Sequence, residues 1–162
     1  MTRKSEVVQV VPVIDKSMRV LCKLAYPNHP KGCPNWNKKD TCPPKAPLLE
    51  SVIILSEPVY LAYNAFDFGG HVKRMKDKHP NWSDRQTECC LYWQGTARKQ
   101  LRQRVESFLA DFPYPQCLEV LYCPEACGVN ITATMQSIGI TMEWPPKTVA
   151  YQVALIGKAI VR

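Results

Sequence analysis

Residues Pro58 to Phe68 read PVYLAYNAFDF and form the clearest strand in the chain. Aromatic and β-branched side chains dominate this stretch, as they do in strands that are buried in a sheet. Gly69 and Gly70 follow immediately and end it. We therefore expect Pro58 to Phe68 to form a central strand, with the other elements arranged around it.

Further extended segments are expected on both sides of this strand. They are Glu6 to Ile14, Met18 to Leu24, Cys117 to Cys123, Ile140 to Trp144 and Val149 to Val161. Pro12 places the first of them at a sheet edge, because proline cannot donate to a strand ladder. Short helices are predicted at 48–55 and 130–138, and 71–79 is either a short helix or an exposed loop.

One long helix is predicted from about Asp84 to Asp111. Ser83 and Gln86 have the spacing of a capping box, and Pro113 stops the helix. The apolar residues recur at steps of three or four, which keeps them on one helical face. They are Cys90, Trp93, Ala97, Leu101, Val105, Phe108 and Phe112. On this pattern Cys90 should pack in the core.

These elements predict an α+β fold with a mixed or mainly antiparallel sheet, one long helix packed on it and a long cysteine-containing loop. The length suits one domain, residues 1–162. The loop spans Ala25 to Pro47, where five prolines precede Pro47 and regular structure is not expected. A loop of this length needs a fastening other than a core, and Cys33 and Cys42 could supply one.

The eight cysteines fall into three groups: Cys22, Cys33 and Cys42; Cys89 and Cys90; and Cys117, Cys123 and Cys127. The short polar start of the chain predicts no secretion signal, and no apolar run is long enough for a membrane span. We therefore expect a cytoplasmic protein without membrane association, in which the cysteines serve as ligands or redox groups in preference to structural disulfides.

Cysteine spacing separates the candidate metal sites. The gaps from Cys22 to Cys33 and from Cys33 to Cys42 are wide for zinc, whose ligands usually come in closely spaced pairs, and the chain has no C-x-x-C. Iron–sulfur clusters accept ligands from separated loops, and proline often follows a ligating cysteine. Proline follows Cys33, Cys42 and Cys123 here.

The stretches MRVLCK and KGCPNWNKKDTCPPKAP resemble the N-terminal signature of a microbial family of predicted metal-binding, iron–sulfur proteins of unknown function. The stretch CPEACGVNITATMQSIGI is similar to that family's C-terminal pattern. Together these stretches cover about a quarter of the chain. Two departures are the wide Cys22 to Cys33 spacing and a last cysteine group without C-x-x-C. The resemblance implies an iron–sulfur cofactor and names no reaction.

The leading hypothesis is one iron–sulfur cluster, a [4Fe-4S] cluster, bound by Cys22, Cys33, Cys42 and one cysteine of the last group. Cys117, Cys123 and Cys127 are the candidates for that fourth ligand, and we favour Cys123 or Cys127. The cluster would serve electron transfer with a redox partner protein, or Lewis-acid chemistry at an open iron. Enzymatic activity is therefore left open, and no catalytic residue is assigned.

Two other classes of function stay open. A zinc-stabilised, non-catalytic module could bind nucleic acid or a partner protein, because the net charge is +7. Basic residues gather at 71–79 and in a run made of Arg98, Lys99, Arg102 and Arg104. A solvated helix face explains such a run equally well, and an anion-binding surface is the alternative. The third class is a disulfide-stabilised protein from an oxidising setting.

Overall fold

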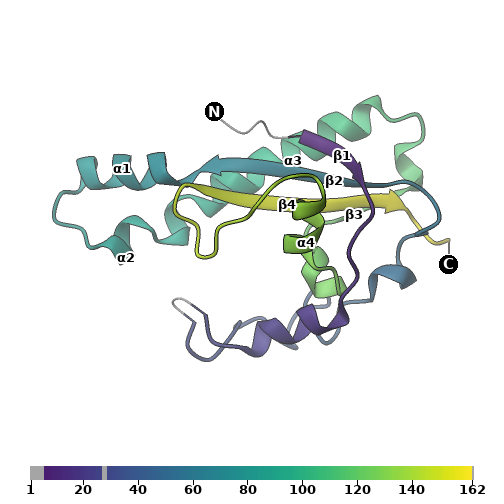
Figure 1. Ribbon diagram of the computed structural model, residues 1–162, viewed down its shortest axis with the longest axis horizontal. Helices are drawn as coiled ribbons and strands as arrows, with labels where there is room; N and C mark the ends of the chain where they lie inside the picture. The colour runs from purple at the N-terminus through teal and green to yellow at the C-terminus, as the bar shows by residue number, and fades with distance from the viewer. Residues whose placement is uncertain (1–5, 27–28, 162) are drawn as a thin grey trace.

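The central strand of the sheet is β2, Val59–Asp67, as the sequence predicts. A computed structural model describes residues 6–26 and 29–161; positions 1–5 of the polar start, 27–28 of the loop and 162 lie outside it. β2 pairs with β1, Glu6–Val10, on one side and with β4, Val149–Lys158, on the other, and β3, Leu118–Leu121, completes the order β1-β2-β4-β3 (Figure 1). Every pairing is antiparallel, which confirms the predicted α+β class, and β1 is an edge strand.

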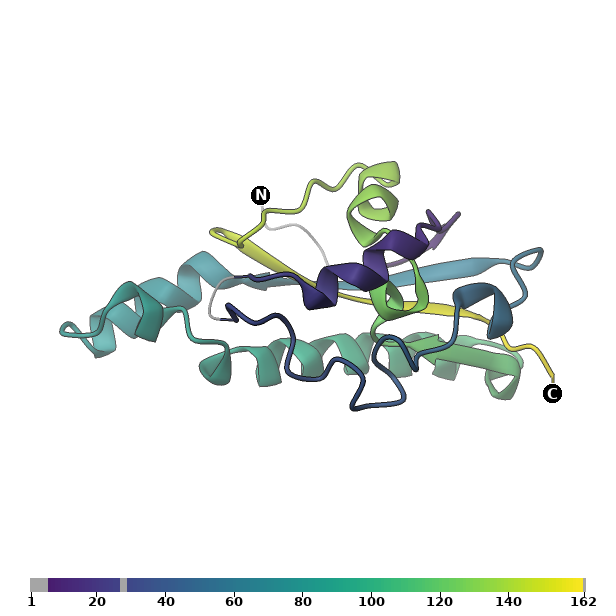
Figure 2. The same ribbon diagram turned by 90° about the horizontal axis from the view of Figure 1, so that it is seen from below.

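Helix α3, Gln94–Asp111, covers one face of the sheet (Figure 2). Successive strand residues point to opposite faces, so Ala62 of β2 and Ala154 of β4 meet Leu101 and Val105 of the helix. The buried Asn64 amide fixes this packing, because it donates hydrogen bonds to Gln100 Oε1 (2.9 Å) and Gln152 Oε1 (3.1 Å). The predicted packing of the long helix is confirmed.

The opposite face of the sheet carries shorter elements. They are the 3₁₀ helices η2, Leu49–Ser51, and η5, Pro124–Cys127, and the helix α4, Ile131–Ser137, which appears above the sheet in Figure 2. Leu61 and Leu155 of the sheet are buried against Met135 of α4 and other apolar side chains on this face. This cluster holds the segment that contains Cys123 and Cys127 firmly to the sheet.

The predicted helix from Asp84 to Asp111 is interrupted. The capping box of Ser83 and Gln86 begins α2, Asp84–Thr87, and a 3₁₀ turn η3, Cys90–Tyr92, precedes α3. Trp93 adopts a non-helical backbone conformation and packs its ring 5.4 Å from that of Phe66. Its indole N–H also donates to the Glu88 carbonyl at 3.2 Å. The turn leaves Cys90 exposed, so the prediction that Cys90 packs in the core is wrong.

Two predicted extended segments differ in the structure. Residues Lys16–Lys23, which include Cys22, form the 3₁₀ helix η1, because the Asp15 carboxylate caps its start by accepting a hydrogen bond from Ser17 N at 3.0 Å. Residues 140–144 belong to no strand. The other elements are α1, Phe68–Lys78, and η4, Pro115–Cys117.

None of the helices in the described part of the chain has both the length and the apolar character that a membrane span requires.

His71 of α1 should make stability depend on pH. Its side chain is buried, and burial lowers its pKa, the positive Arg74 lowers it further, and a backbone hydrogen bond with Thr87 opposes both. The unfolded chain, with an imidazole pKa of about 6.5, therefore binds a proton more readily than the folded chain. Stability should be constant above that pH and fall as the pH decreases below it.

The free energy of unfolding of the variant His71→Gln should decrease less than that of the wild type between pH 7.5 and 5, as measured by denaturant unfolding. His79→Gln is the control, because His79 lies outside the core and stacks on Trp82. Equal pH dependence in the wild type and the His71 variant would contradict the assignment.

Candidate metal centre

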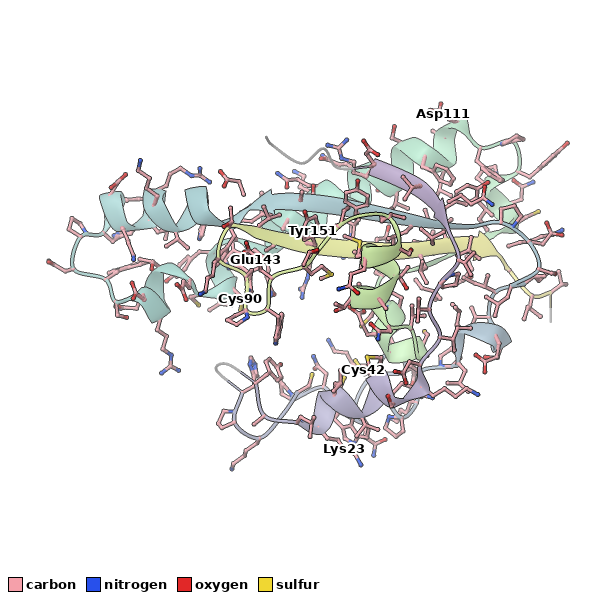
Figure 3. All side chains as sticks on the ribbon, viewed as in Figure 1. Lys23, Cys42, Cys90, Asp111, Glu143 and Tyr151 are labelled. Atoms are coloured by element: carbon pink, nitrogen blue, oxygen red, sulfur yellow. The ribbon has the colours of Figure 1, made fainter. Side chains whose placement is uncertain are left out.

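The cysteine loop, residues 25–47, contains no helix or strand where the structure describes it, as predicted. The loop and η1 lie beyond β3, at that end of the sheet. Figure 2 views the molecule from this side. Figure 3 shows Cys42 on the side of the loop that faces the sheet. The loop is thus placed to bring its thiols toward the segment that follows β3.

Gly32 allows the backbone of Cys33 to lie close to that of Cys22. The Cys33 N–H donates to the Cys22 carbonyl at 2.7 Å, which joins the loop to the end of η1. Gly32 has φ +79°, and a Cβ there would come within 2.7 Å of the Lys23 carbonyl oxygen and 2.9 Å of that of Cys22. Only glycine fits this backbone contact, because both the conformation and the space exclude a side chain.

A backbone tether joins the start of η1 to η5. Asp15 N–H donates to the Gly128 carbonyl at 2.7 Å, and Asn130 N–H donates to the Val13 carbonyl at 2.8 Å. Gly128 adopts φ +85° at the end of η5, where a left-handed residue is required. Cys123 lies at the start of η5, so the tether brings the helix that carries Cys22 to the segment that carries Cys123.

Arg19 connects η1 with the chain after Cys42. Its guanidinium donates to the carbonyls of Pro44 (2.8 Å) and Ala46 (2.6 Å). These bonds hold the segment that follows Cys42 against η1, the helix that carries Cys22. The sequence analysis did not identify Arg19, because no local pattern encodes contacts with carbonyls more than twenty residues away.

Cys22 and Cys123 each lie within range of the charge of other thiols. Burial raises the pKa of Cys22, and the nearby Cys33, Cys42 and Glu125 raise it further. Burial also raises the pKa of Cys123 to about 12; Glu125, Cys42 and Cys22 add to this rise, and a backbone hydrogen bond with Ala126 opposes it. Cys22 of η1 therefore lies near Cys33 and Cys42 of the loop, and Cys123 at the start of η5 lies near Cys22 and Cys42.

The side chains of Cys123 and Glu125 are reached by solvent and are also closely surrounded by protein atoms. Both side chains are exposed to solvent, yet protein atoms surround them closely enough for desolvation to be the main influence on their pKa values. The two observations agree because both residues line a cavity and do not lie on a convex surface. A thiol in such a place is partly desolvated and still reachable.

The other cysteines lie elsewhere. Cys127 is buried in the core beside Leu49 and Val129, where burial raises its pKa and Arg19 partly opposes the rise. Cys117 is exposed at the opposite end of β3 from Cys123, and the four residues of that strand span roughly 13 Å. Of the three cysteines in the last group, Cys123 therefore lies nearest to the group of Cys22, Cys33 and Cys42 in the fold.

Tyr26 adds a second feature that the sequence analysis did not identify. Burial raises the pKa of its hydroxyl, and the adjacent Cys33 raises it further through its charge and a hydrogen bond, with smaller contributions from Cys22 and Cys90. The Tyr26 ring stacks on His29 at 4.5 Å. Cys90, labelled in Figure 3, thus lies close enough to the cysteine loop to act on Tyr26.

All eight cysteines are free thiols. Within residues 6–26 and 29–161, no three His, Cys, Asp or Glu side chains converge closely enough to enclose a metal ion directly. Cys22, Cys33, Cys42 and Cys123 have the donor type that thiolate-bound metals use, but in the described residues they are not close enough to share one ion.

Comparison of the chain with family models, with curated proteins and with solved structures finds no match.

The contact at Gly32 can be tested against a matched glycine. Gly32→Ala should destabilise the fold by more than the roughly 1–2 kcal/mol cost of a left-handed alanine, since its Cβ also meets backbone atoms. Gly139 has φ +80° with open space around it, so Gly139→Ala should incur only the conformational cost.

Denaturant unfolding and metal content per chain measure the difference. For a chain that binds metal through these thiols, we expect reduced metal content in the Gly32 variant and wild-type content in the Gly139 variant. Equal effects of the two substitutions on both measurements would mean that the Gly32 contact does not shape the centre.

Proposed function

We propose that this protein binds one iron–sulfur cluster through Cys22, Cys33, Cys42 and Cys123, and uses it to transfer electrons to or from a redox partner protein. One observation carries this proposal. The charges of Cys33 and Cys42 act on Cys22, and those of Cys22 and Cys42 act on Cys123. A [4Fe-4S] cluster takes four cysteine ligands, which is the number of thiols in this group.

The four thiols come from separated segments, as cluster ligands often do, and three of them precede proline. When bound, such a cluster supplies reversible one-electron chemistry. Four thiolates would complete its coordination, which favours electron transfer over reaction at an open iron. The partial resemblance to predicted iron–sulfur proteins supports the same assignment, and the cytoplasmic setting expected from the sequence would keep the thiols reduced.

The structural elements would then have separate tasks. The Gly32 contact and the Arg19 hydrogen bonds position the first three thiols, and the tether from Asp15 to Gly128 positions Cys123. The half-buried Trp36 ring, with Lys23 Nζ 4.7 Å from its centroid, covers part of the loop. Such packing limits water near a cluster and tunes its potential.

Zinc is the alternative, because four thiolates also form a closed structural zinc site. In that case the protein would be a non-catalytic module that binds nucleic acid or a partner protein through its basic residues. Anaerobic purification separates the two: iron and sulfide with broad visible absorbance support the cluster, and zinc without iron contradicts it. Nucleic-acid binding that weakens steeply with salt would support the module.

Ligand identity can be tested with two serine variants. Cys123→Ser should lose most of its iron and sulfide and become less stable, since metal binding is coupled to folding. Cys117→Ser should retain the wild-type content, because Cys117 lies at the other end of β3. Elemental analysis and denaturant unfolding of both variants provide the measurements. Equal loss in both would exclude the proposed ligand set.

The hydroxyl of Tyr26 should raise the reduction potential of a cluster. A hydrogen bond to a ligating sulfur stabilises the more negative, reduced state, so Tyr26→Phe should lower the potential without loss of iron. Tyr114→Phe is the control, because Tyr114 is 66% exposed and precedes η4. Redox titration followed by visible absorbance measures both. An unchanged potential in the Tyr26 variant would show that its hydroxyl does not act on the cluster.

A further inference from the structure

A cavity of about 680 Å³ lies where β3 stops pairing with β4. β3 pairs with β4 only from Lys158 back to Leu155, and Tyr151, Gln152 and Val153 line the cavity beyond that point. The side chain of Tyr151, labelled in Figure 3, marks the β4 side, and Thr41, next to the labelled Cys42, belongs to the loop side. The volume lies within the range of small-molecule sites, roughly 300–1,000 Å³.

Much of the wall is apolar. Leu101 of α3, Leu121 of β3 and Val153 of β4 line the cavity together with Val52 and Met142. Surfaces of this kind hold the hydrocarbon part of a ligand, and a few polar groups then fix its orientation.

Two arginines supply those polar groups. Arg98 and Arg102 lie four residues apart on α3, so they project from the same side of the helix, and both line the cavity. Neither forms an ion pair in the described part of the chain. Two adjacent guanidinium groups without carboxylate partners are suited to a carboxylate or phosphate, which arginine binds through paired hydrogen bonds.

The acidic residues of the lining do not neutralise this pair by contact. Asp40, Glu119 and Glu125 also face the cavity, but none is within ion-pair distance of either arginine. Asp40 and Glu119 have exposed side chains, as do Arg98 and Arg102, so water screens the charge of all four. Arg104 of the same helix, in contrast, lines a separate depression beside Glu6 and Asn64.

We propose that this cavity binds a small organic molecule that has an apolar body and an anionic carboxylate or phosphate group. The anion pairs with Arg98 and Arg102, and the apolar body lies against Leu101, Leu121 and Val153. Cys123 lines both this cavity and the proposed metal centre, so the two sites adjoin, but the proposal is argued from the cavity lining and the two arginines.

The test uses the protein as purified with its metal, titrated with 3-phenylpropanoate, phenyl phosphate and the neutral 3-phenylpropanol. At least one anion should bind with a dissociation constant below about 10 mM, as expected for a fragment, and the alcohol should bind at least about tenfold more weakly. The tighter anion identifies the ligand as a carboxylate or a phosphate. Chemical-shift changes in amide NMR spectra measure affinity and locate the site.

The double variant Arg98→Gln/Arg102→Gln should weaken anion binding about tenfold or more, because charge-assisted hydrogen bonds are lost. Arg104→Gln removes the same charge from the same helix outside the cavity and should bind like the wild type. Absent anion binding, equal affinity for the alcohol, or equal losses in the two variants would each overturn the proposal. Metal content, measured in parallel, should stay unchanged in the double variant and in the Arg104 variant. This measurement separates a failure of the anion site from a failure of the metal centre.

Discussion

The backbone tether between residues 13–15 and 128–130 is the constraint on which the centre depends. Its two hydrogen bonds, from Asp15 to Gly128 and from Asn130 to Val13, join positions more than one hundred residues apart. Closing a loop of that length has an entropic cost that two hydrogen bonds alone do not repay. The buried cluster around Leu61, Met135 and Leu155 supplies further free energy, because it packs η5 and α4 on the sheet where the N-terminal segment contacts them.

Once the tether is formed, Cys22 and Cys123 lie where loss of the thiol proton is unfavourable. Cys22 and Cys123 have raised pKa values because burial and neighbouring thiols disfavour their ionised forms. A bound cation would offset this cost, because it favours the thiolate form of a cysteine ligand. Under the proposed function, binding would also stabilise the loop that carries Cys33 and Cys42.

Local sequence patterns predicted the parts of the structure that local interactions decide. The strand predicted from the aromatic and β-branched residues of β2, the capping box at Ser83 and the end of α3 at Asp111 all match the structure. The break before α3 could not be predicted, because it depends on Trp93 packing against Phe66 of a distant strand. Likewise, spacing identified Cys22, Cys33 and Cys42 as one group, but only the sheet register separates Cys123 from Cys117, and Arg19 acts through contacts that no periodicity encodes.

The end of β3 at Leu121 relates the proposed metal centre to the cavity. β3 stops pairing with β4 at Leu121 and Leu155, and the chain turns into η5, which begins at Pro124. Proline suits this first position, because its fixed φ fits the start of a helix and no N–H there needs a partner. The turn places Cys123 at the start of η5, and it leaves β4 from Tyr151 to Val153 without a neighbouring strand on that side in the described sheet, where these residues line the cavity together with Cys123. The Cys-Pro pair that suggested a metal ligand in the sequence therefore lies at the wall of the cavity.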